Sequence, residues 1–95
     1  MTDKTELLEA LESALKSKGV QYFHAVVSEN NHGRYVLSVR TKRDQAEIVA
    51  QMFRDLTNFS CTSTSSYKRN ACTEVKTFIR SSVYLTGAIA WFRTL

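Results

Sequence analysis

The most regular pattern in the chain is the alternation of apolar and polar residues from about residue 74 to residue 91. The odd positions carry Val75, Ile79, Val83, Leu85, Ile89 and Trp91, and the even positions carry Glu74, Lys76, Phe78, Arg80 and Ser82. Because successive side chains of a strand point to opposite faces, this pattern predicts a strand with one buried face. The segment exceeds the usual strand of about 5 to 6 residues. We therefore expect Ser81 and Ser82, or Gly87, to break or bend it; a closing helix over residues 86–94 is the alternative.

The first 18 residues predict an amphipathic helix, from about Asp3 to Lys18. Asp3 and Glu6 have the spacing of a capping box, and Gly19 can adopt the left-handed conformation that ends a helix. The apolar stripe consists of Leu7, Leu8, Leu11, Ala14 and Leu15. This stripe predicts that the helix packs one side against a core.

Two segments rich in β-branched and aromatic residues, 20–28 and 34–41, predict a hairpin. The turn formers of residues 29–33 lie between them, and Gly33 can adopt a positive φ. Alternation places Phe23, Ala25, Val27, Tyr35, Leu37 and Val39 inward. It places Tyr22, His24, Arg34, Ser38 and Arg40 outward.

A second helix is expected from about residue 43 to residue 57. Thr41 and Asp44 indicate its start and Asn58 its end. Its apolar stripe consists of Ala46, Val49, Phe53 and Leu56, widened by Ile48 and Met52. The Ser/Thr-rich residues 59–66 are polar but compatible with a strand, and residues 67–70 predict a turn.

The expected order of elements is therefore α-β-β-α-β-β. We predict a single compact α+β domain over residues 1–95, with a mostly antiparallel four-stranded sheet and two helices packed on one face. Moving the last strand to the front would give the ferredoxin-like order, a topological analogy that indicates no function.

Composition indicates an ordinary soluble protein of 95 residues, 43% hydrophobic and 23% charged. No apolar stretch approaches the roughly 20 residues that span a bilayer, and the first residues do not have the pattern of a signal peptide. We therefore expect a cytoplasmic protein with no membrane partner.

The net charge of +4 is unevenly distributed. Residues 1–12 have a local charge of −3, whereas residues 33–54 and residues 65–80 each have +3. A basic body can attract polyanions, and an acidic end can attract a second copy of the chain. An ordinary solvated surface is the simpler explanation of so modest a charge.

Few residues could support catalysis or metal binding. The candidates are His24, His32, Cys61 and Cys72. Their spacings do not match a structural zinc site, and no glycine-rich phosphate loop is present. Cys61 and Cys72 can form a disulfide across a hairpin or remain two reduced thiols. We expect no metal, no cofactor and no enzymatic activity.

The predicted outward sheet face combines cations with aromatic rings. Cations neutralise phosphates, and exposed rings stack on bases, which is how open sheets bind single-stranded nucleic acid. The candidate binding residues are Tyr22, Arg34, Arg40, Lys68, Arg69, Lys76, Phe78 and Arg80. The sequence thus favours a small regulatory or accessory protein that binds nucleic acid or a nucleoprotein.

The alternative is an inhibitor or adaptor that binds another protein and acts as a homodimer. On this hypothesis an apolar strip on the outward face forms the interface, comprising Tyr22, Val36, Phe78, Tyr84 and Phe92. The long terminal strand would supply an edge for pairing, and part of residues 75–95 would lie in the interface.

Overall fold

A computed structural model of the chain describes residues 3–31, 33–60, 64–69, 72–80 and 82–95, with the backbone alone for residues 57–60, 64–69, 72 and 82. Within these ranges the order is α1 (Asp3–Ser17), β1 (Phe23–Glu29), β2 (Tyr35–Lys42), α2 (Arg43–Ser60), β3 (Thr64–Arg69), β4 (Cys72–Ile79), the 3-10 turn η1 (Ser82–Tyr84) and α3 (Leu85–Arg93). The α+β class is confirmed.

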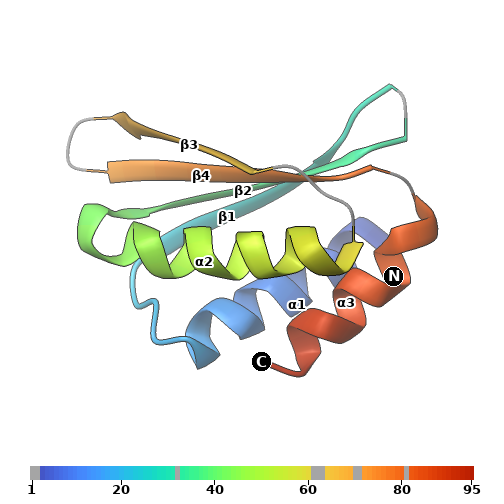
Figure 1. Cartoon of the computed structure of the whole chain (residues 1–95), viewed down its shortest axis with the longest axis horizontal. Coiled ribbons are helices and arrows are strands. Elements are labelled where there is room, and N and C mark those ends of the chain that lie inside the picture. Colours follow the sequence, from blue (N-terminus) through green and yellow to red (C-terminus); the bar gives the residue numbers. More distant parts are fainter. Residues whose placement is uncertain (1–2, 32, 61–63, 70–71, 81) are drawn as a thin grey trace.

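The strands form one antiparallel sheet in the order β1-β2-β4-β3. All three helices of the described residues lie on the same side of this sheet (Figure 1). The opposite side is covered by no element that the structure describes. None of the described helices is long and apolar enough to cross a membrane.

The third helix corrects the prediction that the alternating segment continues as a strand with two helices below the sheet. Leu85 and Ile89 fit both a strand and a helix, but Ala88 and Phe92 are also buried, which is the period of a helix. Val83, expected to point inward, is 80% exposed. The alternative of a closing helix is therefore the correct one, and α3 packs mainly against α1.

The core lies between the helices and the odd-numbered residues of the strands. The centres of the predicted helix stripes are confirmed, because Leu7, Leu11, Leu15, Val49, Phe53 and Leu56 are fully buried. At their margins Leu8 is only partly buried, and Ile48, predicted to widen the second stripe, is 37% exposed. Leu37 and Val39 of β2 and Val75 and Ile79 of β4 are fully buried opposite them. The parity predicted for the strands therefore holds, and the even-numbered residues of β2 and β4 belong to the other side of the sheet.

Several element boundaries differ from the prediction: β1 begins at Phe23 and not at residue 20, and β2 ends at Lys42 and not at Thr41. The helix predicted to end near Asn58 extends to Ser60. The turn predicted at residues 67–70 is partly strand, because β3 continues to Arg69 and pairs with Cys72 of β4. Both glycines expected to adopt positive φ do so, Gly19 at 86° and Gly33 at 74°.

Tyr35 is a buried tyrosine on the core side of β2. Burial raises the pKa of its hydroxyl above the usual value of about 10, and the negative charges of Glu29 and Asp3 raise it further. The neutral hydroxyl therefore contributes stability that is complete below about pH 10 and is lost as the pH rises through the raised pKa.

We predict that the urea midpoint of unfolding falls between about pH 9 and about pH 12, and that Tyr35→Phe makes this fall smaller. Tyr22→Phe, which alters an exposed tyrosine, is the control and should follow the wild type. An equal fall in all three proteins would show that Tyr35 is not responsible.

Candidate functional site

The side of the sheet opposite the helices, called the uncovered face below, carries the even-numbered side chains of β1, β2 and β4. These are His24, Val26, Ser28, Val36, Ser38, Arg40, Lys42, Glu74, Lys76 and Phe78. Strand register aligns them in rows across the sheet, for example His24, Arg40 and Glu74. The uncovered face therefore presents cations, one carboxylate and an aromatic ring on a continuous backbone scaffold.

One end of the uncovered face, which we call the Tyr22 end, gathers Tyr22, His24, Arg40 and Lys42. The ammonium of Lys42 lies 4.6 Å from the centroid of the Tyr22 ring, and Tyr22 is 64% exposed. A hollow of about 310 Å³ is lined by these four residues together with Phe23 and Thr41. Two permanent cations and an exposed ring thus share one shallow depression.

Hydrogen bonds hold the segment before β1 at this end. The hydroxyl of Thr41, which is buried, donates to the carbonyl of Tyr22 at 2.8 Å. The side-chain amide of Gln45 accepts from the backbone N–H of Gln21 at 3.2 Å and donates to the carbonyl of Gly19 at 3.4 Å. The backbone that carries Tyr22 is therefore attached both to β2 and to the first turn of α2.

Glu74 lies in the same row as His24 and Arg40, at the Tyr22 end of the uncovered face, and contacts two of the predicted phosphate-binding cations. Its Oε2 lies 3.6 Å from Nε of Arg40, and its Oε1 lies 3.3 Å from Nζ of Lys76. Its side chain is only 13% exposed, whereas those of Arg40 and Lys76 are 47% and 38% exposed. The two cations flank a carboxylate that reduces the positive charge available to a ligand.

The other end, called the Phe78 end, combines Phe78 with Arg34 and Arg80. Tyr35 and Ile79 are the last register partners of β2 and β4, and Arg34 and Arg80 are the residues that flank this last pair. Both arginines are exposed. The hairpin turn fixes the backbone at Arg34, because its N–H donates to Oδ1 of Asn30 at 3.1 Å and its carbonyl accepts from the N–H of Asn30 at 2.9 Å.

The sequence-predicted residues whose side chains the structure describes thus lie at the two ends of one face, with Lys76 between them. At about 3.4 Å per residue, the six residues from Arg34 to Arg40 separate the ends by about 20 Å. Lys68 and Arg69 lie near the Tyr22 end by backbone register, since Arg69 pairs with Cys72 and Cys72 with Lys42.

Two residues of the uncovered face were not identified as functional from the sequence. Lys42 was missed because the strand was predicted to end at Thr41, although its even position continues the series of Arg34 and Arg40. Glu74 was assigned to the outward face, but its contacts with Arg40 and Lys76 depend on strand register, which the alternation alone does not give.

The apolar strip predicted as a dimer interface is wrong in two of its five members. Phe92 is buried in the core at 1% exposure, and Tyr84 immediately precedes α3 and lies outside the sheet. The expected terminal strand edge is also absent from the described residues, because β4 is paired on both sides and is followed by η1 and α3. Val36 and Phe78 remain on the uncovered face, and Tyr22 lies at its end.

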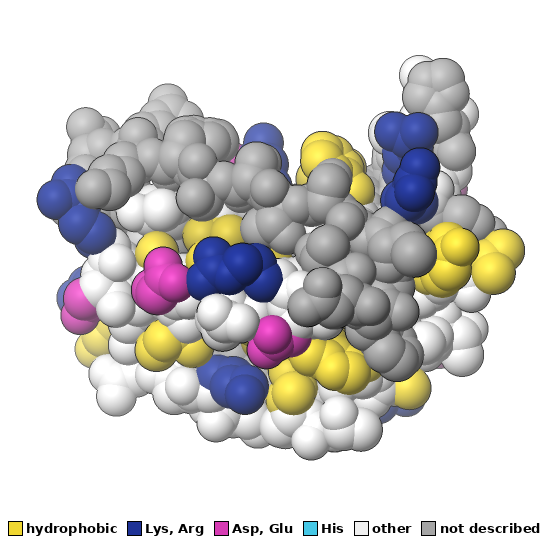
Figure 2. All heavy atoms as spheres, in the orientation of Figure 1, with side chains coloured by type: hydrophobic (Ala, Val, Ile, Leu, Met, Phe, Trp, Pro, Cys, Tyr) yellow, Lys and Arg dark blue, Asp and Glu magenta, His cyan; other side chains and the backbone are white. Residues whose placement is uncertain are grey.

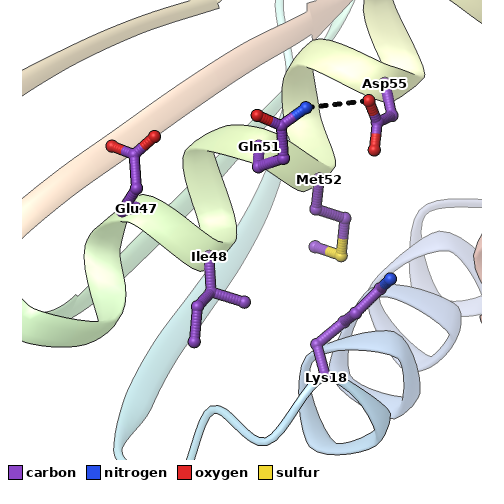
Figure 3. Close-up of a pocket in the computed structure, with 6 residues that line it drawn as sticks. All are labelled: Lys18, Glu47, Ile48, Gln51, Met52 and Asp55. Carbon is purple, nitrogen blue, oxygen red and sulfur yellow. Dashed lines mark hydrogen bonds between the residues drawn. The ribbon is translucent and has the colours of Figure 1, made fainter.

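The helical side of the molecule carries mixed charges. Figure 2 shows basic and acidic side chains next to one another over α2, where Arg54 contacts Glu47 at 2.6 Å. A groove of about 360 Å³ beside α2 has an apolar floor of Ile48 and Met52, with Lys18 pointing toward it from the end of α1 (Figure 3). Asp55 on its rim accepts a hydrogen bond from Gln51. These polar groups pair with neighbours on their own helix and do not converge on a common point.

The remaining sequence candidates contribute little to a site. His32 and Cys61 lie outside the described residues, and Cys72 is described by its backbone alone. Among the described residues, no group of three or more His, Cys, Asp or Glu side chains is arranged to bind a metal ion. Comparison with protein-family models, curated proteins and solved structures finds no match to this chain.

Proposed function

We propose that this protein is a non-catalytic binding protein that holds single-stranded nucleic acid along the uncovered face of its sheet. The observation that supports the proposal is the pairing of cations with an aromatic ring at both ends of that face. Tyr22 lies beside Lys42 and Arg40 at one end, and Phe78 lies beside Arg80 and Arg34 at the other.

The chemistry of these groups suits an unpaired strand. Arginine and lysine bind phosphate oxygens, and aromatic rings stack on bases that are not held in a duplex. In this arrangement Arg80 and Lys42 contact phosphates, while Phe78 and Tyr22 provide surfaces for bases. The helices on the other side of the sheet take no part in contact with the ligand.

The separation of the two ends favours a long ligand over a small anion. A single phosphate or nucleotide can occupy only one end, because the ends are about 20 Å apart at the rise of an extended strand. A linear polyanion can contact both ends at once, so that the second contact forms at high effective concentration.

A protein partner is the competing function, and one observation favours it. Val26 is 42% exposed, and it shares the uncovered face with the half-buried Val36 and Phe78. Apolar and aromatic side chains of this kind are typical of protein interfaces, including that of a homodimer. Salt separates the two functions, because phosphate binding weakens steeply with ionic strength whereas an apolar interface responds little.

The deciding experiment is a fluorescence anisotropy titration of labelled single- and double-stranded oligonucleotides of about 4 to 16 nucleotides. We expect single strands to bind more tightly than duplexes at low salt, with affinity rising until the strand spans both ends. Absence of association with every oligonucleotide would reject the proposal. Sedimentation at high protein concentration would then test for the homodimer.

Charge-neutralising variants test whether the two ends act together. Arg80→Gln and Lys42→Gln should each weaken binding and reduce the magnitude of the slope of log K against log salt by about 0.7, the value for one phosphate on a single strand. Arg93→Gln, an exposed arginine of α3, removes the same charge from the helical side and is the matched control. An equal effect of the control would show that only net charge matters.

A further inference from the structure

We propose that Glu74 limits the affinity of the uncovered face for single-stranded nucleic acid by acting as an internal anion that occupies Arg40 and Lys76. This inference rests on the proposed function and assigns a regulatory role to one residue of the same face. Glu74 is a positioning residue, since it acts through the two cations and not by contact with the ligand.

The position of Glu74 in the sheet explains why it reaches both cations. Register places Arg40 directly opposite Glu74 on β2, and Lys76 lies two residues further along β4 on the same face. Each carboxylate oxygen faces a different cation, Oε2 toward Arg40 and Oε1 toward Lys76. The carboxylate therefore lies between Arg40 of the Tyr22 end and Lys76, which is further along the sheet toward the Phe78 end.

The contact distances show that neither ion pair is a tight charge-assisted hydrogen bond. At 3.6 Å and 3.3 Å both exceed the range of about 2.7 to 2.9 Å that is typical of strong charge-assisted hydrogen bonds. Arg40 and Lys76 are also more exposed than Glu74 itself, so that a phosphate can approach them from solvent. A phosphate must then compete with the carboxylate for each cation and also experiences its repulsion. The uncovered face therefore binds single-stranded nucleic acid more weakly than it would if Arg40 and Lys76 had no carboxylate between them.

The test is the variant Glu74→Gln, which removes the charge and keeps the size of the side chain. We expect binding of a labelled single strand at low salt to become about fivefold tighter, since the interaction of two unit charges about 4 Å apart is about 1 kcal/mol even in water, which is a factor of about five. The slope of log K against log salt should also increase in magnitude, by about 0.7 for each cation that gains a phosphate contact.

The matched control is Glu47→Gln on α2. Glu47 also contacts an arginine, Arg54 at 2.6 Å, and its removal changes the net charge by the same amount on the helical side. Binding that tightens equally in both variants would overturn the inference, because net charge would then be the cause. Unchanged binding in Glu74→Gln would also overturn it.

A double-mutant cycle with Arg40→Gln compares the change in affinity caused by Glu74→Gln with and without Arg40. A purely structural role of Glu74 would give the same change in both backgrounds. The gain from Glu74→Gln should be smaller when Arg40 is absent, since one of the two cations that it makes available is missing. Glu74→Thr, a residue suited to strands, provides the same comparison if the glutamine variant unfolds. Glutamine and threonine are both neutral, so neither places an unpaired charge at this half-buried position, and we expect both variants to fold.

Failure of this inference is distinguishable from failure of the proposed function. If neither the wild type nor Glu74→Gln binds any oligonucleotide, the proposed function is wrong. If the wild type binds single strands and Glu74→Gln binds them no more tightly, the proposed function stands and the role of Glu74 is rejected.

Discussion

Replacing Phe53 by alanine is expected to lower the free energy of unfolding by about 3 to 5 kcal/mol, the range for removing a large aromatic side chain from a core. Phe53 is fully buried on α2, in the core that also contains Leu11 of α1 and Val75 of β4. The alanine variant loses the transfer energy of the ring and leaves a cavity that the surrounding helices fill only in part. Urea unfolding followed by circular dichroism measures the change.

Val83→Ala is the control for this prediction, because Val83 is apolar but 80% exposed. Its effect should stay within about 0.5 kcal/mol, as for most surface substitutions. A second variant, Phe53→Asp, should not fold, since a buried carboxylate without a partner is costly. A folded Phe53→Asp protein would contradict the packing of α2 described above.

Replacing Phe78 by alanine is expected to weaken binding of single-stranded nucleic acid by about 1 to 3 kcal/mol, the contribution of one base stacked on an aromatic ring. The dissociation constant should therefore rise by a factor of about 5 to about 150. Phe78 lies on the uncovered face beside Val36, two residues before Arg80. Anisotropy titration at a fixed low salt concentration measures the change.

Phe78 is half-buried, so the binding comparison requires a folded variant. Thermal unfolding establishes the temperature at which the wild type and Phe78→Ala are both native. Tyr84→Ala is the matched control, because it removes a partly exposed ring that immediately precedes α3 and lies outside the sheet. Equal losses in the two variants, or no loss in Phe78→Ala, would remove Phe78 from the binding surface.

Much of the candidate site follows from the parity of two strands. A period of two assigns Arg40, Lys76 and Phe78 to the side away from the core, since their neighbours in the sequence, Val39, Val75 and Ile79, are apolar and buried. The division of the site into two ends does not follow from parity. It depends on the antiparallel register of β2 and β4, which brings Arg40 opposite Glu74 and ends at the pair of Tyr35 and Ile79, beside Arg34 and Arg80.

The sequence by itself determined the helices that begin near Asp3 and Arg43, the first hairpin and the inward face of each of its strands. These elements depend on local capping, turn chemistry and periodicity, which act over a few residues. The segment after Ile79 was different, because Leu85 and Ile89 are compatible with a strand and with a helix. Only the tertiary structure decided between them. The pairing of β4 with β2 ends at Tyr35 and Ile79, where β2 begins, so the chain beyond Ile79 has no described strand beside it to pair with, and it buries Ala88 and Phe92 against α1 and α2 as a helix.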